Sequence, residues 1–252
     1  MRRPVVAALL LGALAAEAQV SEEAVLHAVP LETTVRGEVD WKARQLEGVL
    51  DEPKAALPAF LSRRGVRVDA TGRWKLENLV APPPKDKPVA RHRNASWVID
   101  FDQASFTPAW KTAVDELGPK PTAAALTAFA GRYLSRKSYD RGLDLASQVA
   151  TRREGDCTEH AVFLTALLRK AGIPARAMIG LVLVAFPDRV RSYGHMWVEA
   201  FVEGRWQVFD AALGTAPAAW LPAGELSDEG PGYALGLAGL LNTLAVRSLE
   251  LR

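Results

Sequence analysis

The strongest helical pattern in the chain begins at Cys157. The apolar positions after it are three or four residues apart, as one buried face of a helix requires: Ala161, Leu164, Leu167, Leu168 and Ala171. Gly172 and Pro174 end this pattern. Asp156 and Glu159 stand three residues apart at its start, which is the spacing of a capping box. The sequence therefore predicts a helix whose first residue is Cys157.

Other elements follow from weaker patterns. Apolar residues at helical spacing predict a helix within residues 121–134, and a short helix is predicted at residues 146–152. Residues 66–76 contain a Thr71-Gly72 turn signal and predict a hairpin, and residues 97–101 predict a strand. Residues 81–88 hold four prolines, which cannot donate to a strand ladder, and predict a surface loop.

A second strong pattern lies downstream of the Cys157 helix. An apolar run at residues 176–184 predicts a buried strand. Residues 194–202 and 205–210 are β-prone and flank Glu203-Gly204, which predicts a hairpin with a two-residue turn. Register counted from this turn pairs Val202 with Arg205 and Trp197 with Asp210. Alternation then gathers a set of side chains on one face: His195, Trp197, Glu199, Phe201, Trp206, Val208 and Asp210. His195 and Asp210 become diagonal neighbours, about 7–8 Å apart at the backbone.

These patterns divide the chain into four parts. Residues 1–18 combine basic Arg2-Arg3, an apolar segment and a small-x-small site at residues 16–18. They predict a secretory signal peptide, with a buried N-terminal helix as the alternative. Residues 19–104 are expected to be a β-rich N-terminal region, residues 105–215 the catalytic core, and residues 216–252 an extension packing on that core. Within the extension, the apolar run at residues 233–246 is too short for a transmembrane helix and predicts a packed helix or a helix–strand pair.

Composition narrows the function classes. The 252 residues are 49% hydrophobic with a formal charge of +2, which is ordinary for a globular protein. Basic residues are scattered and not interleaved with aromatic ones, so we expect no nucleic-acid partner. The signal peptide predicts an exported protein, periplasmic or secreted, with no transmembrane anchor in the mature chain. Exported proteins use cysteines mostly in disulfide pairs, whereas this chain has one cysteine. Such a cysteine forms an intermolecular bridge, is buried and inert, or is reactive.

The position of Cys157 favours the reactive alternative. Free N–H groups and the positive end of the helix dipole stabilise a thiolate, so we expect a thiol pKa below about 8.5. Gly155 is expected to leave the sulfur accessible. His195 would activate the thiol, and Asp210 would hold the imidazole tautomer of His195.

Two alternatives concern His160, which lies three residues after Cys157. It could compete with His195, but no orienting acid is evident beside it, so we interpret it as a structural residue. A zinc site of Cys157, His160 and His195 is the other alternative, although a single Cys-x-x-His pair is weak support for a metal.

Four blocks of this sequence resemble the bacterial transglutaminase-like superfamily of the papain-like cysteine fold. The blocks are residues 155–161, 171–176 and 194–199, followed by Trp206 with Asp210. The resemblance implies an α+β fold, in which a helix bearing the nucleophile packs on an antiparallel sheet bearing histidine and aspartate. It implies Cys157 as nucleophile, His195 as general base and acid, and Asp210 as orienting acid. The family often continues Asp-Pro-Thr where this chain has Asp210-Ala211-Ala212, so an altered loop geometry is expected.

The implied chemistry is acyl transfer on peptide or amide bonds through a thioester, with no cofactor and no metal. Water as acceptor gives a cysteine peptidase or amidase, which we favour for an exported protein, with cell-envelope peptide as a natural substrate class. An amine as acceptor gives a cross-linking protein-glutamine transamidase. A non-catalytic binding or scaffold module that retains the site is the third hypothesis. The backbone amide of Cys157 is the expected oxyanion donor, and Gln148 is a candidate for a second one.

Overall fold

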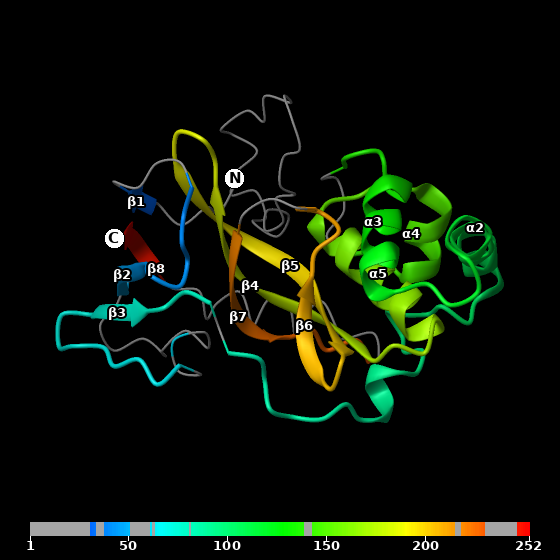
Figure 1. Ribbon diagram of the computed structural model, residues 1–252, viewed down its shortest axis with the longest axis horizontal. Coiled ribbons are helices and arrows are strands. Elements are labelled where there is room, and N and C mark those ends of the chain that lie inside the picture. Colours follow the sequence, from blue (N-terminus) through cyan, green and yellow to red (C-terminus); the bar gives the residue numbers. More distant parts are fainter. Residues whose placement is uncertain are drawn as a thin grey trace, which may run out of the picture.

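The computed structural model describes residues 31–33, 38–50, 61, 64–80, 82–138, 143–214, 218–229 and 246–252. The predicted signal peptide lies outside these residues, and so does the predicted apolar segment at 233–246 apart from Val246. The helices gather at one end of the molecule and a small sheet lies at the other, with the long strands β4 and β5 running between them (Figure 1).

The described strands form two four-stranded sheets. The first has the order β6-β5-β4-β7 and is antiparallel. Its strands are β4 (Ala175–Ala185), β5 (Val190–Val202), β6 (Arg205–Phe209) and β7 (Ala218–Glu225). The second has the order β1-β8-β2-β3. Its strands are β1 (Leu31–Thr33), β2 (Gln45–Leu50), β3 (Arg73–Glu77) and β8 (Val246–Leu251).

The hairpin predicted at residues 194–210 is confirmed, and so is its register. β5 and β6 pair from Val202–Arg205 back to Val198–Phe209. Glu203 and Gly204 both have positive φ, 53° and 79°, as the tight turn between twisted strands requires. Asp210 is therefore the first residue after β6. The predicted strand at 176–184 is confirmed as β4.

Gly180 of β4 is the partner of His195 in the β4–β5 ladder. A Cβ on Gly180 would lie 2.2 Å from the Leu221 carbonyl oxygen and 2.9 Å from Cη2 of Trp197. The β4–β7 register also shifts between Ile179 and Gly180. The sheet is thus closely packed directly beside His195, and only glycine fits at this position.

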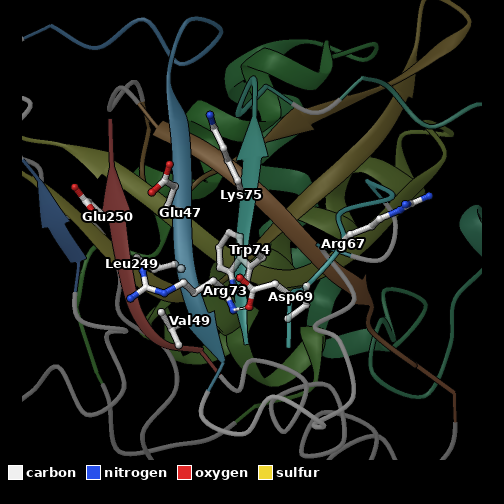
Figure 2. Close-up of a pocket in the computed structure, with 11 residues that line it drawn as sticks. Glu47, Val49, Arg67, Asp69, Arg73, Trp74, Lys75, Leu249 and Glu250 are labelled. Atoms are coloured by element: carbon white, nitrogen blue, oxygen red, sulfur yellow. Dashed lines mark hydrogen bonds between the residues drawn. The ribbon is translucent and has the colours of Figure 1, made fainter. Parts of the chain in front are cut away.

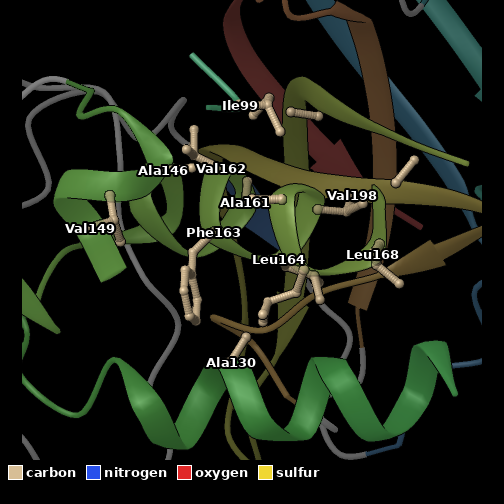
Figure 3. Close-up of a cluster of buried hydrophobic side chains, with 14 of the residues drawn as sticks. Ile99, Ala130, Ala146, Val149, Ala161, Val162, Phe163, Leu164, Leu168 and Val198 are labelled. Atoms are coloured by element: carbon tan, nitrogen blue, oxygen red, sulfur yellow. The ribbon is translucent and has the colours of Figure 1, made fainter. Parts of the chain in front are cut away.

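The main core surrounds α5 (Cys157–Lys170), in which every residue from Cys157 to Arg169 is buried. Figure 3 shows this helix between the sheet and the other helices. Its apolar side chains join Val198 of the sheet, Ala130 of α3 (Ala123–Tyr133) and Val149 of α4 (Ala146–Arg152) in one cluster. All three helices were predicted.

Helix α2 (Thr107–Leu117) was not predicted. Its fully buried residues are Ala109 and Ala113, and the half-buried Trp110 and Leu117 also pack against the main core. The small side chains at the fully buried positions weaken the apolar pattern of this helix. Two short 3-10 helices, η2 (Ala90–His92) and η3 (Ala104–Phe106), lie nearby in the chain.

The strand predicted at residues 97–101 is wrong. Val98 and Ile99 are fully buried in the main core, but none of the described strands pairs with this segment. Instead, the Val98 N–H donates to the carbonyl of Asp228, and the Val98 carbonyl accepts from the N–H of Ala146. Val98 and Ile99 are apolar because this irregular segment is buried. A short apolar run alone cannot distinguish such a segment from a strand.

The hairpin predicted at residues 66–76 is partly present. The turn forms at Gly72, with φ of 83°, and Val68 makes a single antiparallel bridge to Trp74. The second arm is β3, which pairs along its length with β2. Residues 82–89 have no regular structure, as the prolines predicted.

The second sheet has its own core. Leu46, Trp74 and Leu76 cluster there with Leu181 and Leu221 of the first sheet. A hollow on this sheet is lined by charged side chains that include Glu47, Arg73, Lys75 and Glu250 (Figure 2). None of its lining residues belongs to the candidate site described below.

The fold is the expected α+β arrangement, a Cys157-bearing helix packed on an antiparallel sheet. The domain boundaries at residues 104 and 215 stay predictions. β7 extends the first sheet beyond residue 215, while β8, close to residue 252, lies in the second sheet between β1 and β2. None of the described helices has the length and apolar character needed to cross a membrane.

Candidate active site

Cys157 is the first residue of α5, as predicted, and the capping box before it is formed. The Thr158 N–H donates to Asp156 Oδ1 at 2.8 Å, and the Asp156 N–H donates to Glu159 Oε2 at 3.0 Å. Gly155 has φ of 152°, and a Cβ there would lie 2.3 Å from Glu159 Cβ. The turn before Cys157 therefore needs glycine both for its φ and for the close approach of Glu159.

His195 and Asp210 are brought together by the hairpin. His195 Nε2 lies 2.7 Å from Asp210 Oδ2, and Trp220 Nε1 donates to the same oxygen at 2.9 Å. The other oxygen, Oδ1, accepts from the N–H groups of Ala212 and Leu213. Burial acts to raise the pKa of Asp210, but the charge of His195 and these hydrogen bonds outweigh it and lower that pKa.

These contacts fix the tautomer of His195. Because the carboxylate of Asp210 accepts, Nε2 carries a proton, and in the neutral form of the imidazole Nδ1 carries the lone pair. Nδ1 is buried and has no hydrogen-bond partner in the described structure. The indole ring of Trp197 is stacked near the imidazole, with ring centroids 6.3 Å apart and planes 19° apart. The His195 ring is therefore held by Asp210 and Trp197, and its Nδ1 is free to accept a proton.

The thiol of Cys157 differs from its sequence prediction. The residue is 0% exposed, so the expected accessible sulfur is wrong for this conformation. Burial, followed by the charge of Asp156, raises the pKa of Cys157 well above its ordinary value, and a hydrogen bond from the Met196 backbone only partly opposes this rise. The expected low pKa is therefore also wrong here, because loss of hydration outweighs the helix N-terminus. With Nδ1 unpartnered, no hydrogen bond joins the described sulfur and imidazole.

Asp156 and Glu159 form a buried pair of carboxyl groups next to the thiol. Thr158 Oγ1 lies 2.6 Å from Asp156 Oδ1 and 3.0 Å from Glu159 Oε2, so the two acids converge on one hydroxyl. Burial, then the charge of Glu159, raises the pKa of Asp156 to about 8. At neutral pH this pair therefore holds a proton, which limits the negative charge beside Cys157.

His160 is held by its own helix. Its Nδ1 donates to the backbone carbonyl of Asp156 at 2.6 Å. Burial and the charge of Lys137 lower its pKa to about 4, so it is neutral at physiological pH. Its hydrogen bond supports the structural interpretation of this residue. In the described part of the chain, no three His, Cys, Asp or Glu side chains are placed to hold a metal ion, which includes the trio considered for zinc.

Two residues outside the predicted triad interact with it, and one predicted candidate stays untested. Trp220 bonds Asp210 from β7, and Lys137 interacts electrostatically with Cys157 and Asp210; neither was predicted. Neither belongs to the four sequence blocks, so those blocks do not indicate it. Gln148, the candidate oxyanion donor, is exposed on α4, and its assignment stays a prediction.

Residues 111–211 match the family model of the transglutaminase-like superfamily. This stretch contains Cys157, His195 and Asp210, and the resemblance drawn from the four blocks is confirmed for it. The comparison with curated proteins gave no match.

Among solved structures, the chain is similar to a candidate cysteine protease from Cytophaga hutchinsonii. The two share 17% identity with a TM-score of 0.38, over 70% of this chain and 75% of that one. It is also similar to the periplasmic domain of TgpA from Pseudomonas aeruginosa bound to ethylmercury. That match has 17% identity and a TM-score of 0.36, over 68% of this chain and 66% of that one.

Proposed function

We propose that this chain is a thiol-dependent acyl-transfer enzyme acting on peptide or amide bonds, with Cys157, His195 and Asp210 as its triad. One observation carries the proposal. His195 is held through Nε2 by Asp210, while its Nδ1 is buried without a partner, close to the first residue of a capped helix. An imidazole with one nitrogen oriented by a carboxylate and the other free to accept a proton is the arrangement that activates a nucleophile. The family match over residues 111–211 supports a cysteine-type enzyme.

The reaction has two steps. Nδ1 of His195 takes the thiol proton, and the sulfur of Cys157 attacks the carbonyl carbon of the substrate amide. The carbon–nitrogen bond then breaks, and the imidazolium gives its proton to the leaving amine. This leaves an acyl thioester on Cys157. Water, deprotonated by His195, attacks the thioester, releases a carboxylic acid and restores the thiol.

Asp210 stabilises the imidazolium between these steps. Its carboxylate is held by Trp220 and two backbone N–H groups, so it stays ionised and in place while the charge on His195 changes. The backbone amide of Cys157, at the helix start, is the proposed donor to the oxyanion.

Substrate must reach a sulfur that is fully buried in this conformation. The reaction therefore requires an opening movement that brings water and substrate to the thiol. Hydration would also remove the main cause of its raised pKa, since burial is the largest contribution to that shift. The movement that admits substrate would thus also lower the pKa of the Cys157 thiol.

Hydrolysis is the favoured outcome of the thioester. The predicted signal peptide directs the chain out of the cytoplasm, and peptides of the cell envelope are substrates available there. Transamidation of protein glutamine shares the same thioester and differs only in the acceptor. Analysis of products with and without added primary amine separates the two, because a transamidase transfers the acyl group to the amine in preference to water.

The test of the triad is the pH dependence of Cys157 alkylation by iodoacetamide in the wild type and in His195→Ala. We expect reaction that depends on His195, with a clear loss of rate in the variant at neutral pH. Alkylation with the pH profile of a free thiol in both proteins would contradict an active Cys–His pair. Cys157→Ser serves as the control that all label resides on this residue.

The burial of Cys157 favours a second candidate function, a binding module that keeps the site closed. This alternative predicts that Cys157→Ala retains the cellular role of the wild type. A loss of that role in the folded variant would exclude the binding module.

A further inference from the structure

The two oxygens of the Asp210 carboxylate are held in different ways. Oδ1 accepts from the N–H groups of Ala212 and Leu213, at 3.1 Å and 3.0 Å, so the loop that follows Asp210 holds this oxygen. Oδ2 accepts from two side chains on strands, His195 at 2.7 Å and Trp220 at 2.9 Å. A carboxylate offers about two acceptor positions on each oxygen. These four donors therefore fill the carboxylate, and Trp220 is the donor that comes from β7.

Strand β7 is anchored so that Trp220 turns towards Asp210. Trp220 is the partner of Val182 in the β4–β7 ladder at the edge of the first sheet (Figure 1). Its neighbours Ala219 and Leu221 are buried in the core of the second sheet. Successive residues of a strand point to opposite faces, so burying these two neighbours directs the Trp220 indole to the other face of β7, where it meets Asp210.

The backbone of β7 also lies directly against the strand that pairs with His195. Gly180 of β4 is the ladder partner of His195, and a Cβ on Gly180 would lie 2.2 Å from the Leu221 carbonyl oxygen and 2.9 Å from the Ala223 nitrogen. A contact this close is possible only because Gly180 has no side chain. The separation of β7 from the histidine is thus set by backbone contact, which a side-chain rotation cannot change.

An indole N–H is chemically suited to hold Oδ2. Trp220 can only donate and does not titrate, so its bond to Asp210 is the same before and after His195 takes up a proton. Trp220 is half-buried, and burial strengthens a hydrogen bond to a charged oxygen. Burial raises the pKa of Asp210, and the Trp220 bond is one of the contacts that lower it. Both effects keep an ionised oxygen facing His195 Nε2.

We propose that Trp220 is a positioning residue of the triad, whose indole N–H fixes Asp210 Oδ2 so that Asp210 can hold the Nε2–H tautomer of His195. This inference rests on the proposed function. Trp220 acts through Asp210 and takes no part in proton transfer. It lies beyond residues 111–211, the stretch that matches the transglutaminase-like superfamily. The unit needed for the reaction therefore extends past the family match into β7.

A competing role for Trp220 is packing alone. It packs against a small cluster that contains Val182, Val184, Tyr193 and Leu213. Trp220→Phe keeps an aromatic ring in this cluster and removes the N–H. Val184→Ala is the matched control, because it removes apolar contacts from the same cluster and leaves every donor to Asp210 in place.

Two measurements compare the wild type with both variants, after urea unfolding has shown that each variant is folded. The first is nitrogen-15 NMR of labelled histidine, which distinguishes ring nitrogens with and without a proton; His195→Ala identifies the signals of His195. Trp220→Phe should show a smaller share of the Nε2–H tautomer than the wild type. The second is the rate of Cys157 alkylation by iodoacetamide at neutral pH, which should fall about three- to tenfold in Trp220→Phe.

The proposal requires both changes in Trp220→Phe and neither in Val184→Ala. A wild-type tautomer and a wild-type rate in Trp220→Phe would overturn it. Equal changes in both variants would also overturn it, since lost packing would then explain them. Faster alkylation of Trp220→Phe would show that the indole weakens the Asp210–His195 bond by competing for Oδ2, which is the opposite of the proposed role.

The proposed function and this inference fail in different ways. Alkylation that depends on His195 but not on Trp220 would leave the proposed function standing without the inference. Alkylation of the wild type that does not depend on His195 would contradict the proposed function, whereas the tautomer of His195 would still report whether Trp220 positions Asp210.

Discussion

Replacing Asp156 by asparagine should make the protein more stable at pH 8 and leave its stability at pH 4 nearly unchanged. Asp156 is buried beside Glu159, and its pKa is raised from 3.8 to about 8. Folding therefore requires this carboxyl group to keep a proton at pH values where the unfolded chain has lost it. Stability is fully present below the unfolded pKa and is lost as the pH rises towards the folded pKa, with no further loss above it.

The size of this effect follows from the two pKa values. They lie about four pH units apart, which corresponds to at most about 6 kcal/mol if Asp156 titrates alone. The charge of Glu159 contributes to this shift, so part of the penalty depends on the pair and not on Asp156 alone. We expect a wild-type loss of about 2–4 kcal/mol between pH 4 and pH 8 from this site.

Asparagine reproduces the protonated form of Asp156. Its oxygen can accept from Thr158, as Asp156 Oδ1 does at 2.8 Å, and its NH₂ can donate to the Glu159 carboxylate in place of the acid proton. The assay is urea unfolding of wild type and Asp156→Asn at pH 4, 6 and 8, with Asp115→Asn, an exposed residue of α2, as control. If the free energy of unfolding of wild type and Asp156→Asn changed equally with pH, the claim that Asp156 is buried with a proton would be refuted. The pKa of Cys157 should also fall in this variant, because the charge of Asp156 helps to raise it.

Two other substitutions test the geometry of the site. Gly155→Ala should destabilise the protein by about 3 kcal/mol, since its Cβ would lie 2.3 Å from Glu159 Cβ. Gly172 has a φ of 79° and open space around it. Gly172→Ala should therefore cost only about 1 kcal/mol in the same unfolding assay. Equal losses would contradict the steric argument. Asp210→Asn should lower kcat at least about 100-fold, because its NH₂ would face the His195 Nε2–H and favour the wrong tautomer; a near-wild-type rate on any substrate of the wild type would show that Asp210 does not orient His195.

Local sequence determined the elements that carry the candidate site. The capping box at Asp156 and Glu159 fixed the start of α5 at Cys157, since caps act within one helical turn. The two-residue turn at Glu203-Gly204 fixed the β5–β6 register, and with it the meeting of His195 and Asp210. The short patterns failed where burial occurs without regular structure, as at Val98, or where the fully buried positions of a helix are alanines, as in α2.

The tertiary structure decided the electrostatics of the site. The helix N-terminus alone predicts a low thiol pKa, but complete burial of Cys157 reverses the direction, because desolvation depends on every segment packed around the sulfur. The same holds for the contact of Trp220 with Asp210 and for the charge of Lys137 that acts on the site, since both depend on long-range packing. The sequence by itself determined that Cys157 begins a helix and that His195 meets Asp210, since capping and hairpin pairing are local. Only the fold decided how exposed they are and which charges they feel, since hydration and Coulomb interactions depend on the whole surrounding chain.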